Sequence, residues 1–277
     1  MPTRIDLLIS ADHLKSIQPG NAVVIDTRSS WKYFVGHLPG SINLPDWKDF
    51  TITVDGVKGM LNEDKKFIIE TLRKLGIDKN KSIVLYGDPA DPWRTDGRFF
   101  WMFERYGFQS VAILEGGMDL WVKSGGAVER GRGASSTASK LTLEDIQLNP
   151  DTVADRNWIL ERLENPDLIV IDNRTREEYD GAKPYGSERG GHIPKAVHIP
   201  WQEFFTANGL LKKTEALKGL LDKYGIRPQQ QIVVYCTGGV RSAMAYFVFR
   251  YLGYNVRNYD GSWWDWSHQP ELPVETN

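Results

Sequence analysis

A single cysteine stands at a point of the chain where chemistry is expected. Cys236 is the only cysteine of the 277 residues, and it follows Gln231–Tyr235, an apolar run with the β-branched composition of a buried strand. Beyond the next six residues, Ala243–Leu252 has the composition of a largely buried helix, which Gly253 can end. The sequence therefore places one thiol between the end of a strand and the start of a helix.

The loop that follows this thiol predicts an anion-binding site. Backbone N–H groups at the start of a helix have no acceptor within the helix, so they can converge on one ligand. Two adjacent glycines permit the positive φ values of such a loop and let the backbone approach a ligand closely. The predicted ligand-binding residues are Thr237, Gly238, Gly239, Val240, Arg241 and Ser242.

The surroundings of Cys236 predict a reactive thiol. A free cysteine has a pKa of about 8.5, and both a helix dipole and the Arg241 cation would favour the thiolate. A thiolate is a nucleophile, so this site predicts covalent chemistry at sulfur. The alternative is that Cys236 is a small, inert, buried residue, which is a common role of a single cysteine.

The composition narrows the function classes. The chain has 34 Lys and Arg against 36 Asp and Glu, a formal net charge of -2, so we expect no nucleic acid and no acidic membrane as partner. One cysteine cannot form an internal disulfide, a Cys-x-x-Cys redox pair or a structural zinc cluster. The five histidines show no metal-ligand spacing, and we expect neither a metal nor a cofactor.

The ends and the hydropathy of the chain bear on its location. Met1–Asp6 lacks the apolar segment of a signal peptide, and no run of eighteen apolar residues occurs. We therefore expect a soluble, cytoplasmic protein. This argument leaves open a leader removed from a longer precursor.

Short apolar strands alternate with helices along the chain. In the first half, Ser10 predicts the N-cap of a helix, and the expected elements are strands over 22–28, 82–86 and 111–114 and helices over 11–17, 64–75 and 96–106. Strands over 168–174 and 231–235 are expected in the second half. This alternation predicts an α/β fold, with a parallel sheet covered by helices on both faces.

The second half repeats the first. The matching segments are Val23–Arg28 with Leu168–Arg174, Gly36–Pro45 with Gly191–Pro200, and Glu115–Trp121 with Asp260–Trp266. The spacing is near 150 residues, which is too long for a solenoid repeat and indicates a duplicated domain. A stretch rich in Gly, Ser and Arg, from residue 123 to 140, separates the copies and is typical of a linker.

The two copies differ at the thiol. Gly87 stands in the first half where Cys236 stands in the second, and it is followed by two prolines and two aspartates within the next five residues. Such a loop cannot form an amide-lined anion site and has no nucleophile, so the first half is predicted to be a support domain.

Both halves resemble rhodanese domains, and the whole chain resembles a tandem-domain sulfurtransferase of the rhodanese superfamily. The resemblance is carried by the Asp-x-Arg strand end and the Gly-His-x-Pro segment in each half, by the Glu/Asp-Gly segment that ends in tryptophan, and by the Cys-x-x-Gly-Val loop of the second half. It implies two tandem rhodanese-like α/β domains, each with a central parallel sheet of about five strands flanked by helices. The expected divisions are an inactive rhodanese-like domain over 1–125, a linker over 126–140 and a catalytic rhodanese-like domain over 141–277.

By this resemblance, Cys236 is the nucleophile that receives a sulfane sulfur and holds it as a persulfide. The implied partners are a small-molecule donor, thiosulfate or 3-mercaptopyruvate, and an acceptor that is cyanide, a small thiol or a thioredoxin-like protein.

The loop bears on the choice of donor. Thiosulfate-using members commonly carry basic residues at the second and third loop positions, which are Thr237 and Gly238 here. Members that use 3-mercaptopyruvate commonly carry a serine at the third position, together with a histidine and an acidic residue of the first domain. Gly238 has no hydroxyl and residues 46–67 contain no histidine, so thiosulfate is the preferred donor, with Arg241 as the cation for its oxygen atoms.

Two further arginines lie near the motifs. Arg189, directly before Gly190, is predicted to bind the oxygen atoms of the donor. Arg174 could do the same, but the first half carries Asp26 and Arg28 at the matching strand end without a thiol. Arg174 is therefore expected to form a structural ion pair with Asp172.

The same comparison of the two halves makes His37 and His192 structural, because both copies carry them. Tyr185, Trp263 and Trp264 are candidates for the wall of a pocket, although core packing is their default role.

Two other functions remain open. Dual-specificity phosphatases, which rhodanese domains resemble, have five residues between cysteine and arginine, whereas four separate Cys236 from Arg241. A smaller loop suits a sulfur atom better than a phosphoryl group. The second alternative is a rhodanese scaffold without catalysis, which the intact thiol loop argues against.

Overall fold

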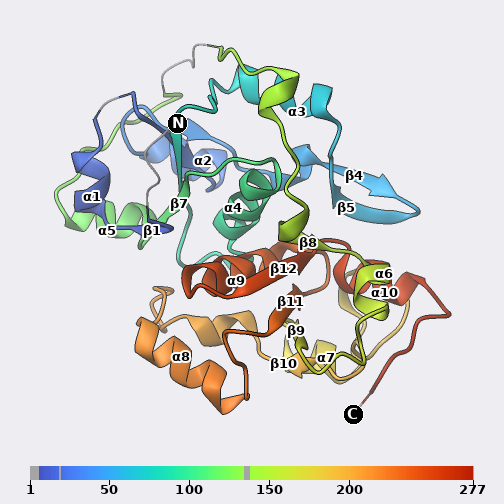
Figure 1. Ribbon diagram of the computed structural model, residues 1–277. Coiled ribbons are helices and arrows are strands. Elements are labelled where there is room, and N and C mark those ends of the chain that lie inside the picture. The colour runs from blue at the N-terminus through green and yellow to red at the C-terminus, as the bar shows by residue number, and fades with distance from the viewer. Residues whose placement is uncertain (1–5, 19, 134–137, 277) are drawn as a thin grey trace. The chain divides into compact units, whose positions relative to one another are not determined.

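The computed structural model describes residues 6–18, 20–133 and 138–276, which divide into two compact units (Figure 1). The first unit contains Met1–Phe50 and Asn62–Asn149, and the second contains Thr51–Leu61 and Pro150–Asn277. The division does not follow the chain strictly, because residues 51–61 from the first half belong to the second unit.

The first unit is built on a parallel sheet of five described strands in the order β1-β7-β6-β2-β3. The strands are β1 (Leu8–Ile9), β2 (Ala22–Asp26), β3 (Ile42–Asn43), β6 (Ser82–Tyr86) and β7 (Val111–Leu114). The helices are α1 (Ala11–Ser16), α2 (Ser30–Val35), α3 (Lys65–Lys74), α4 (Thr95–Arg105) and α5 (Gly117–Lys123), with 3₁₀ turns η1 (Trp47–Phe50) and η2 (Leu143–Asp145).

The second unit has an equivalent parallel sheet, in the order β10-β9-β11-β12-β8. The strands are β8 (Val153–Ala154), β9 (Leu168–Asp172), β10 (Val197–His198), β11 (Gln231–Tyr235) and β12 (Asn255–Tyr259). The helices are α6 (Arg156–Leu160), α7 (Arg176–Tyr179), α8 (Thr214–Lys223), α9 (Val240–Tyr251) and α10 (Ser262–His268), with 3₁₀ turns η3 (Pro150–Thr152), η4 (Pro184–Gly186) and η5 (Trp201–Phe204).

The predicted α/β fold is confirmed, and the repeat in sequence is a repeat in structure. Read from the opposite edge, the second sheet has the strand order of the first, with β11 in the place of β6 and β9 in the place of β2. The two strands end at Asp26 and Asp172, two residues earlier than predicted. The arginine two residues after each aspartate leaves the strand and donates to that aspartate's carboxylate.

Both faces of the second sheet are buried, as parallel strands require. Val233 and Tyr235 of β11 point to a core cluster that α6 and α10 complete with Ile159 and Trp266. The alternate residues of β11 point to the other face, and α9 packs along β11 and β12 without contributing to that cluster. This packing fixes the end of β11, where Cys236 begins the loop.

Residues 51–61 form an antiparallel hairpin of β4 (Thr51–Val54) and β5 (Val57–Leu61). The hairpin packs on the second unit, where β5 contacts α10. The backbone N–H of Leu61 donates to the buried Asp260 carboxylate at 2.7 Å, and Val57 is buried. The sequence patterns did not predict this hairpin.

The predicted linker over 126–140 is not a free tether along its described part. Glu129 pairs with His37 as an isolated β-bridge, and the Trp121 indole N–H donates to the Ala127 carbonyl at 2.7 Å. Residues 134–137 of this predicted linker lie outside the described residues. The helices that are described include none with the length and apolar character needed to cross a membrane.

Candidate active site

The end of β11 is held by a buried polar framework. The Tyr235 hydroxyl donates to Asp172 Oδ2 at 2.6 Å and accepts the backbone N–H of Ile193 at 3.1 Å. Burial and then the Asp172 charge raise the pKa of Tyr235 well above its usual value, so the hydroxyl remains a donor. Arg174 bonds both oxygens of Asp172 at 2.6–3.0 Å, which is the structural ion pair expected from the sequence.

The backbone of Cys236 is fixed by the start of α10. Its N–H donates to Ser262 Oγ at 3.1 Å, and its carbonyl accepts the N–H of Trp263 at 3.0 Å. Ser262 adopts φ of 51°, in the left-handed region, and its hydroxyl donates to the Tyr259 carbonyl at 2.7 Å. Both backbone polar groups of Cys236 are thus satisfied away from the loop, which leaves the side chain to face the loop amides.

The thiol of Cys236 lies among hydrogen-bond donors. The Ser242 hydroxyl donates to Sγ at 3.5 Å, and the backbone N–H groups of Ser242 and Gly238 favour the charged form of the sulfur. Gly239, with φ of 75°, reverses the chain before Val240 starts α9. Burial raises the pKa of the Cys236 thiol, but the Arg241 charge and these donors outweigh burial, so the pKa is lowered. The site therefore favours a thiolate although Cys236 is only 1% exposed.

Arg241 is paired with a buried carboxylate. Its guanidinium donates to both oxygens of Glu178 at 2.7 Å and to the Thr237 hydroxyl at 2.6 Å, and Thr237 in turn donates to Glu178 at 2.6 Å. Burial raises the pKa of Glu178, but the bonds and charge of Arg241 prevail and lower it to about 2. This arrangement differs from the prediction that Arg241 serves the donor's oxygen atoms, because its guanidinium is engaged in bracing the loop.

An indole ring lies against the loop at Gly238. A Cβ added to Gly238 would lie 2.3 Å from the ring of Trp264, so a larger residue there would collide with it. Trp264 is held by its backbone N–H, which donates to the Thr237 carbonyl at 2.9 Å, and by its indole N–H, which donates to the Tyr185 carbonyl at 3.1 Å. Tyr185 is 52% exposed, with its ring centroid 6.0 Å from the Arg241 guanidinium.

Comparison with known protein families accounts for both halves of this architecture. The family described as rhodanese-like domain matches residues 10–124 and again residues 155–269, so each match includes four of the five described strands of one sheet and begins directly after its edge strand, β1 or β8. The chain belongs to the rhodanese family. The resemblance inferred from the motifs is thereby confirmed.

Individual relatives extend along nearly the whole rhodanese chain. The putative thiosulfate sulfurtransferase SseA of Mycobacterium bovis is 33% identical over an alignment of 281 residues. The alignment covers 96% of this chain and 90% of that protein. A thiosulfate sulfurtransferase of Azotobacter vinelandii is 29% identical over 266 residues, with 96% and 95% covered. The crystal structure of YnjE shares the fold with a TM-score of 0.83 at 23% identity, over 98% of this chain and 68% of that one.

The first rhodanese domain has a carboxylate where the second has the loop of Cys236. Gly87 follows Tyr86, which pairs with Asp26 in register as Tyr235 pairs with Asp172. A Cβ at Gly87 would lie 3.0 Å from the Asp96 carboxylate carbon. That carboxylate accepts the N–H of Gly97 at the start of α4. An acid bound to the helix start leaves no place there for an anionic ligand.

Arg189 is predicted to bind the oxygen atoms of the donor, but its side chain contacts the end of α10. Its guanidinium donates to four backbone carbonyls at 2.6–3.1 Å, those of Trp266, Ser267, Gln269 and Leu272. These carbonyls end α10 and the turn after it, so Arg189 caps a helix of the rhodanese fold. The geometry does not support a role for its side chain in binding the donor.

The two motif histidines have matching structural contacts. His37 stacks on Tyr33 and His192 stacks on Tyr179, with ring centroids 3.8 and 3.7 Å apart, and each Nδ1 bonds the carbonyl of the same tyrosine. Trp263 is fully buried in the core cluster, so it is not a pocket wall.

Sequence reasoning missed Glu178 and Ser262. Glu178 belongs to the capping box Thr175-x-x-Glu178 that starts α7, a signal that indicates a helix start but not a partner 63 residues later. Ser262 matches Gly117 of the first domain in the repeat, and both have positive φ. A non-glycine residue at a position where the other copy carries glycine was the available signal.

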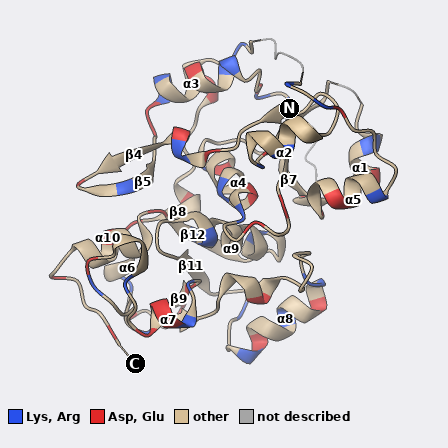
Figure 2. Ribbon diagram, turned by 180° about the vertical axis from the view of Figure 1, so that it is seen from behind, with Lys and Arg blue, Asp and Glu red and all other residues tan. Residues whose placement is uncertain are grey.

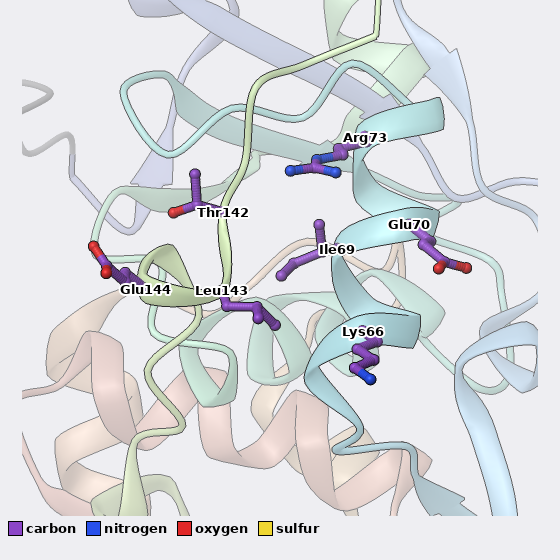
Figure 3. A pocket seen from close by; sticks show the side chains of 7 residues that line it. All are labelled: Lys66, Ile69, Glu70, Arg73, Thr142, Leu143 and Glu144. Carbon is purple, nitrogen blue, oxygen red and sulfur yellow. The ribbon is translucent and has the colours of Figure 1, made fainter.

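A cavity of about 530 Å³ lies elsewhere, in the first unit, between α3 and the segment around η2 (Figure 3). Its lining residues are Lys66, Ile69, Glu70, Arg73, Thr142, Leu143 and Glu144. None of these side chains is a thiol or forms part of the Cys236 loop. Over the described residues, no group of three or more His, Cys, Asp or Glu side chains is arranged to hold a metal ion.

Proposed function

We propose that this rhodanese is a sulfurtransferase that carries a sulfane sulfur on Cys236. The observation that supports it is a thiol that accepts the Ser242 hydroxyl at 3.5 Å and whose pKa is lowered by the Arg241 charge. Donors that stabilise a thiolate also stabilise the terminal sulfur of a persulfide, which carries the same charge one atom further out. The names of the relatives, thiosulfate sulfurtransferase, support the same reaction class.

The proposed first step is attack of the Cys236 thiolate on the outer sulfur of thiosulfate. A new sulfur–sulfur bond forms to Cys236, the bond between the two sulfur atoms of thiosulfate breaks, and sulfite leaves with its electron pair. Reactants and products both carry three negative charges, so no proton is needed. A thiophilic acceptor, cyanide or a thiol of a small molecule or protein, then takes the terminal sulfur and restores the thiolate.

Thiosulfate remains the proposed donor in preference to 3-mercaptopyruvate. The contact of Trp264 on Gly238 leaves no room for a third-position side chain, so the loop cannot present a hydroxyl at that place. The first rhodanese domain is proposed to be non-catalytic, because Gly87 and Asp96 take the places of a thiol and an anion site.

The test is the mass of the intact protein after incubation with thiosulfate and removal of the excess. Wild type should gain about 32 Da, one sulfur atom, and lose it again on addition of cyanide. Cys236→Ala should gain nothing. An unchanged wild-type mass with thiosulfate, 3-mercaptopyruvate and polysulfide alike would overturn the proposal, and turnover of an aryl phosphate would favour the phosphatase alternative.

A further inference from the structure

The thiol loop has little positive charge to offer a dianionic donor. Arg241 is paired with Glu178, and Arg174 is paired with Asp172. The second and third loop positions, Thr237 and Gly238, are uncharged. An ionised Cys236 therefore repels an incoming anion, and the sequence around the loop does not show what attracts it.

The hairpin from the first half of the chain brings a lysine to the second unit. Lys58 lies on β5 and is the only Lys or Arg of residues 51–61. Figure 2 shows a blue stretch on β5, the colour of Lys and Arg. The hairpin is held by the bond from Leu61 N–H to Asp260 at 2.7 Å and by Asp55, 3.8 Å from Arg156. The position of Lys58 on the second unit is therefore fixed by contacts on both sides of it in sequence.

Lys58 and the thiol loop lie against the same aromatic ring, that of Trp264. Its ammonium lies 4.7 Å from the ring centroid of Trp264, and the same ring lies against Gly238, two residues after Cys236. Trp264 cannot move freely, because it donates from both nitrogens to carbonyls of Thr237 and Tyr185. The Lys58 side chain is exposed, and over the described residues no carboxylate lies within ion-pair distance of its ammonium.

We propose that Lys58 is a specificity-determining residue, which attracts anionic sulfur donors to the thiol loop. This inference rests on the proposed function. An unpaired ammonium stacked on Trp264 supplies, from the hairpin, the positive charge that Thr237 and Gly238 do not. The Lys58 cation acts on the donor through its electric field. It therefore raises the rate of encounter and strengthens weak binding, and it leaves the attack of Cys236 on the donor unchanged.

The test is the second-order rate of persulfide formation on Cys236, followed by the 32 Da mass gain in the full-length protein. Two donors react in the same way but differ in charge: thiosulfate is a dianion, and ethanethiosulfonate, which releases a sulfinate, is a monoanion. At low ionic strength, Lys58→Glu should slow loading from thiosulfate about 10-fold and from ethanethiosulfonate about 3-fold, because the energy scales with the donor charge. Both effects should largely vanish at about 0.5 M salt, where charges are screened within a few Å.

Matched variants separate charge from structure. Lys58→Met keeps an unbranched stem on Trp264 and should slow thiosulfate about 3-fold, while Lys58→Arg should retain the wild-type rate within about 2-fold. Lys218→Glu, at an exposed position on α8, changes the net charge by the same amount and should have less than about a 2-fold effect.

Two results would overturn the inference while wild type still loads. One is equal rates for Lys58→Glu and Lys218→Glu; the other is a loss in Lys58→Glu that is the same for both donors and at high salt, which would indicate a disturbed hairpin. Failure of wild type to load from any donor would instead overturn the proposed function.

Discussion

The acidity of one thiol is a balance of burial against charge. Burial alone would keep Cys236 protonated, and Arg241 is the largest contribution that opposes it. Replacing Arg241 by Met should therefore raise the pKa of Cys236, so that the thiolate forms only at higher pH. Because the single change leaves Glu178 buried without its cation, at a cost of about 3–5 kcal/mol, the Arg241→Met/Glu178→Gln variant is the better test.

The measurement is the rate of alkylation by iodoacetamide as a function of pH. In wild type, the rate should reach half of its plateau at a pH below the pKa of a free cysteine. In the double variant, this midpoint should move to higher pH. Ser242→Ala, which removes one donor to Sγ but no charge, should move the midpoint less. Equal midpoints in the Glu178→Gln single variant and in the double variant, which differ only in the Arg241 cation, would show that Arg241 does not control the ionisation.

At the scale of residues, the sequence revealed the thiol but not its surroundings. Cys236 could be recognised because its signals are contiguous: a strand, two glycines, an arginine and a helix. Arg241 could be recognised as a cation, but its partner Glu178 stands 63 residues earlier, and a pairing across that separation exists only after β9 and β11 align. The partners of Arg189 could not be predicted for the same reason, since the carbonyl groups that it contacts lie about 80 residues away in the chain.

At the scale of elements, the loop and α10 depend on each other through Gly238. Trp264 lies where a side chain at position 238 would stand, so Gly238→Ala must displace the ring or the loop. We expect this variant to lose about 1–3 kcal/mol of unfolding free energy, as overpacking of a tight contact does. Loading of Cys236 from thiosulfate should slow as well, because the displaced loop carries the amide of Gly238.

The matched control is Gly219→Ala on α8, where an added Cβ meets nothing within 4 Å. Alanine at an exposed helical position should raise the stability by about 0.5–1 kcal/mol and leave loading unchanged. Urea unfolding followed by circular dichroism measures both variants. A Gly238→Ala protein as stable as wild type would contradict the close contact between Trp264 and the loop.

Most elements could be predicted, and the exceptions share a cause. The strands β6, β7 and β11 were predicted with their observed bounds, because fully buried parallel strands are continuous apolar runs. The hairpin β4–β5 was not, since Ile52 and Val54 are exposed and no residue of β4 is buried. What defines this element is its docking on α10, which lies about 200 residues later in the chain.

At the scale of the whole molecule, both copies of the duplicated domain keep the same structural ion pair, and only the second copy carries the thiol. The bonds of Arg28 to Asp26 and to the Gly36 carbonyl are repeated by Arg174 with Asp172 and the Gly191 carbonyl, with equal distances of 2.6 and 2.7 Å. The pair therefore serves the fold in both halves, whereas the loop that follows the central strand differs between them.

This symmetry allows the same substitution to be made in the copy that carries the thiol and in the copy that does not. Asp26→Asn and Asp172→Asn each remove a fully buried carboxylate from an arginine whose side chain is at most 9% exposed, so each should destabilise its own unit by about 3–5 kcal/mol. Urea unfolding should change from one transition to two in both variants, and persulfide loading of Cys236 should follow the earlier transition only in Asp172→Asn. In Asp26→Asn, loading without urea should equal that of wild type, since Asp26 supports a sheet that carries no thiol. A loss equal to that in Asp172→Asn would mean that the first unit contributes directly to the reaction.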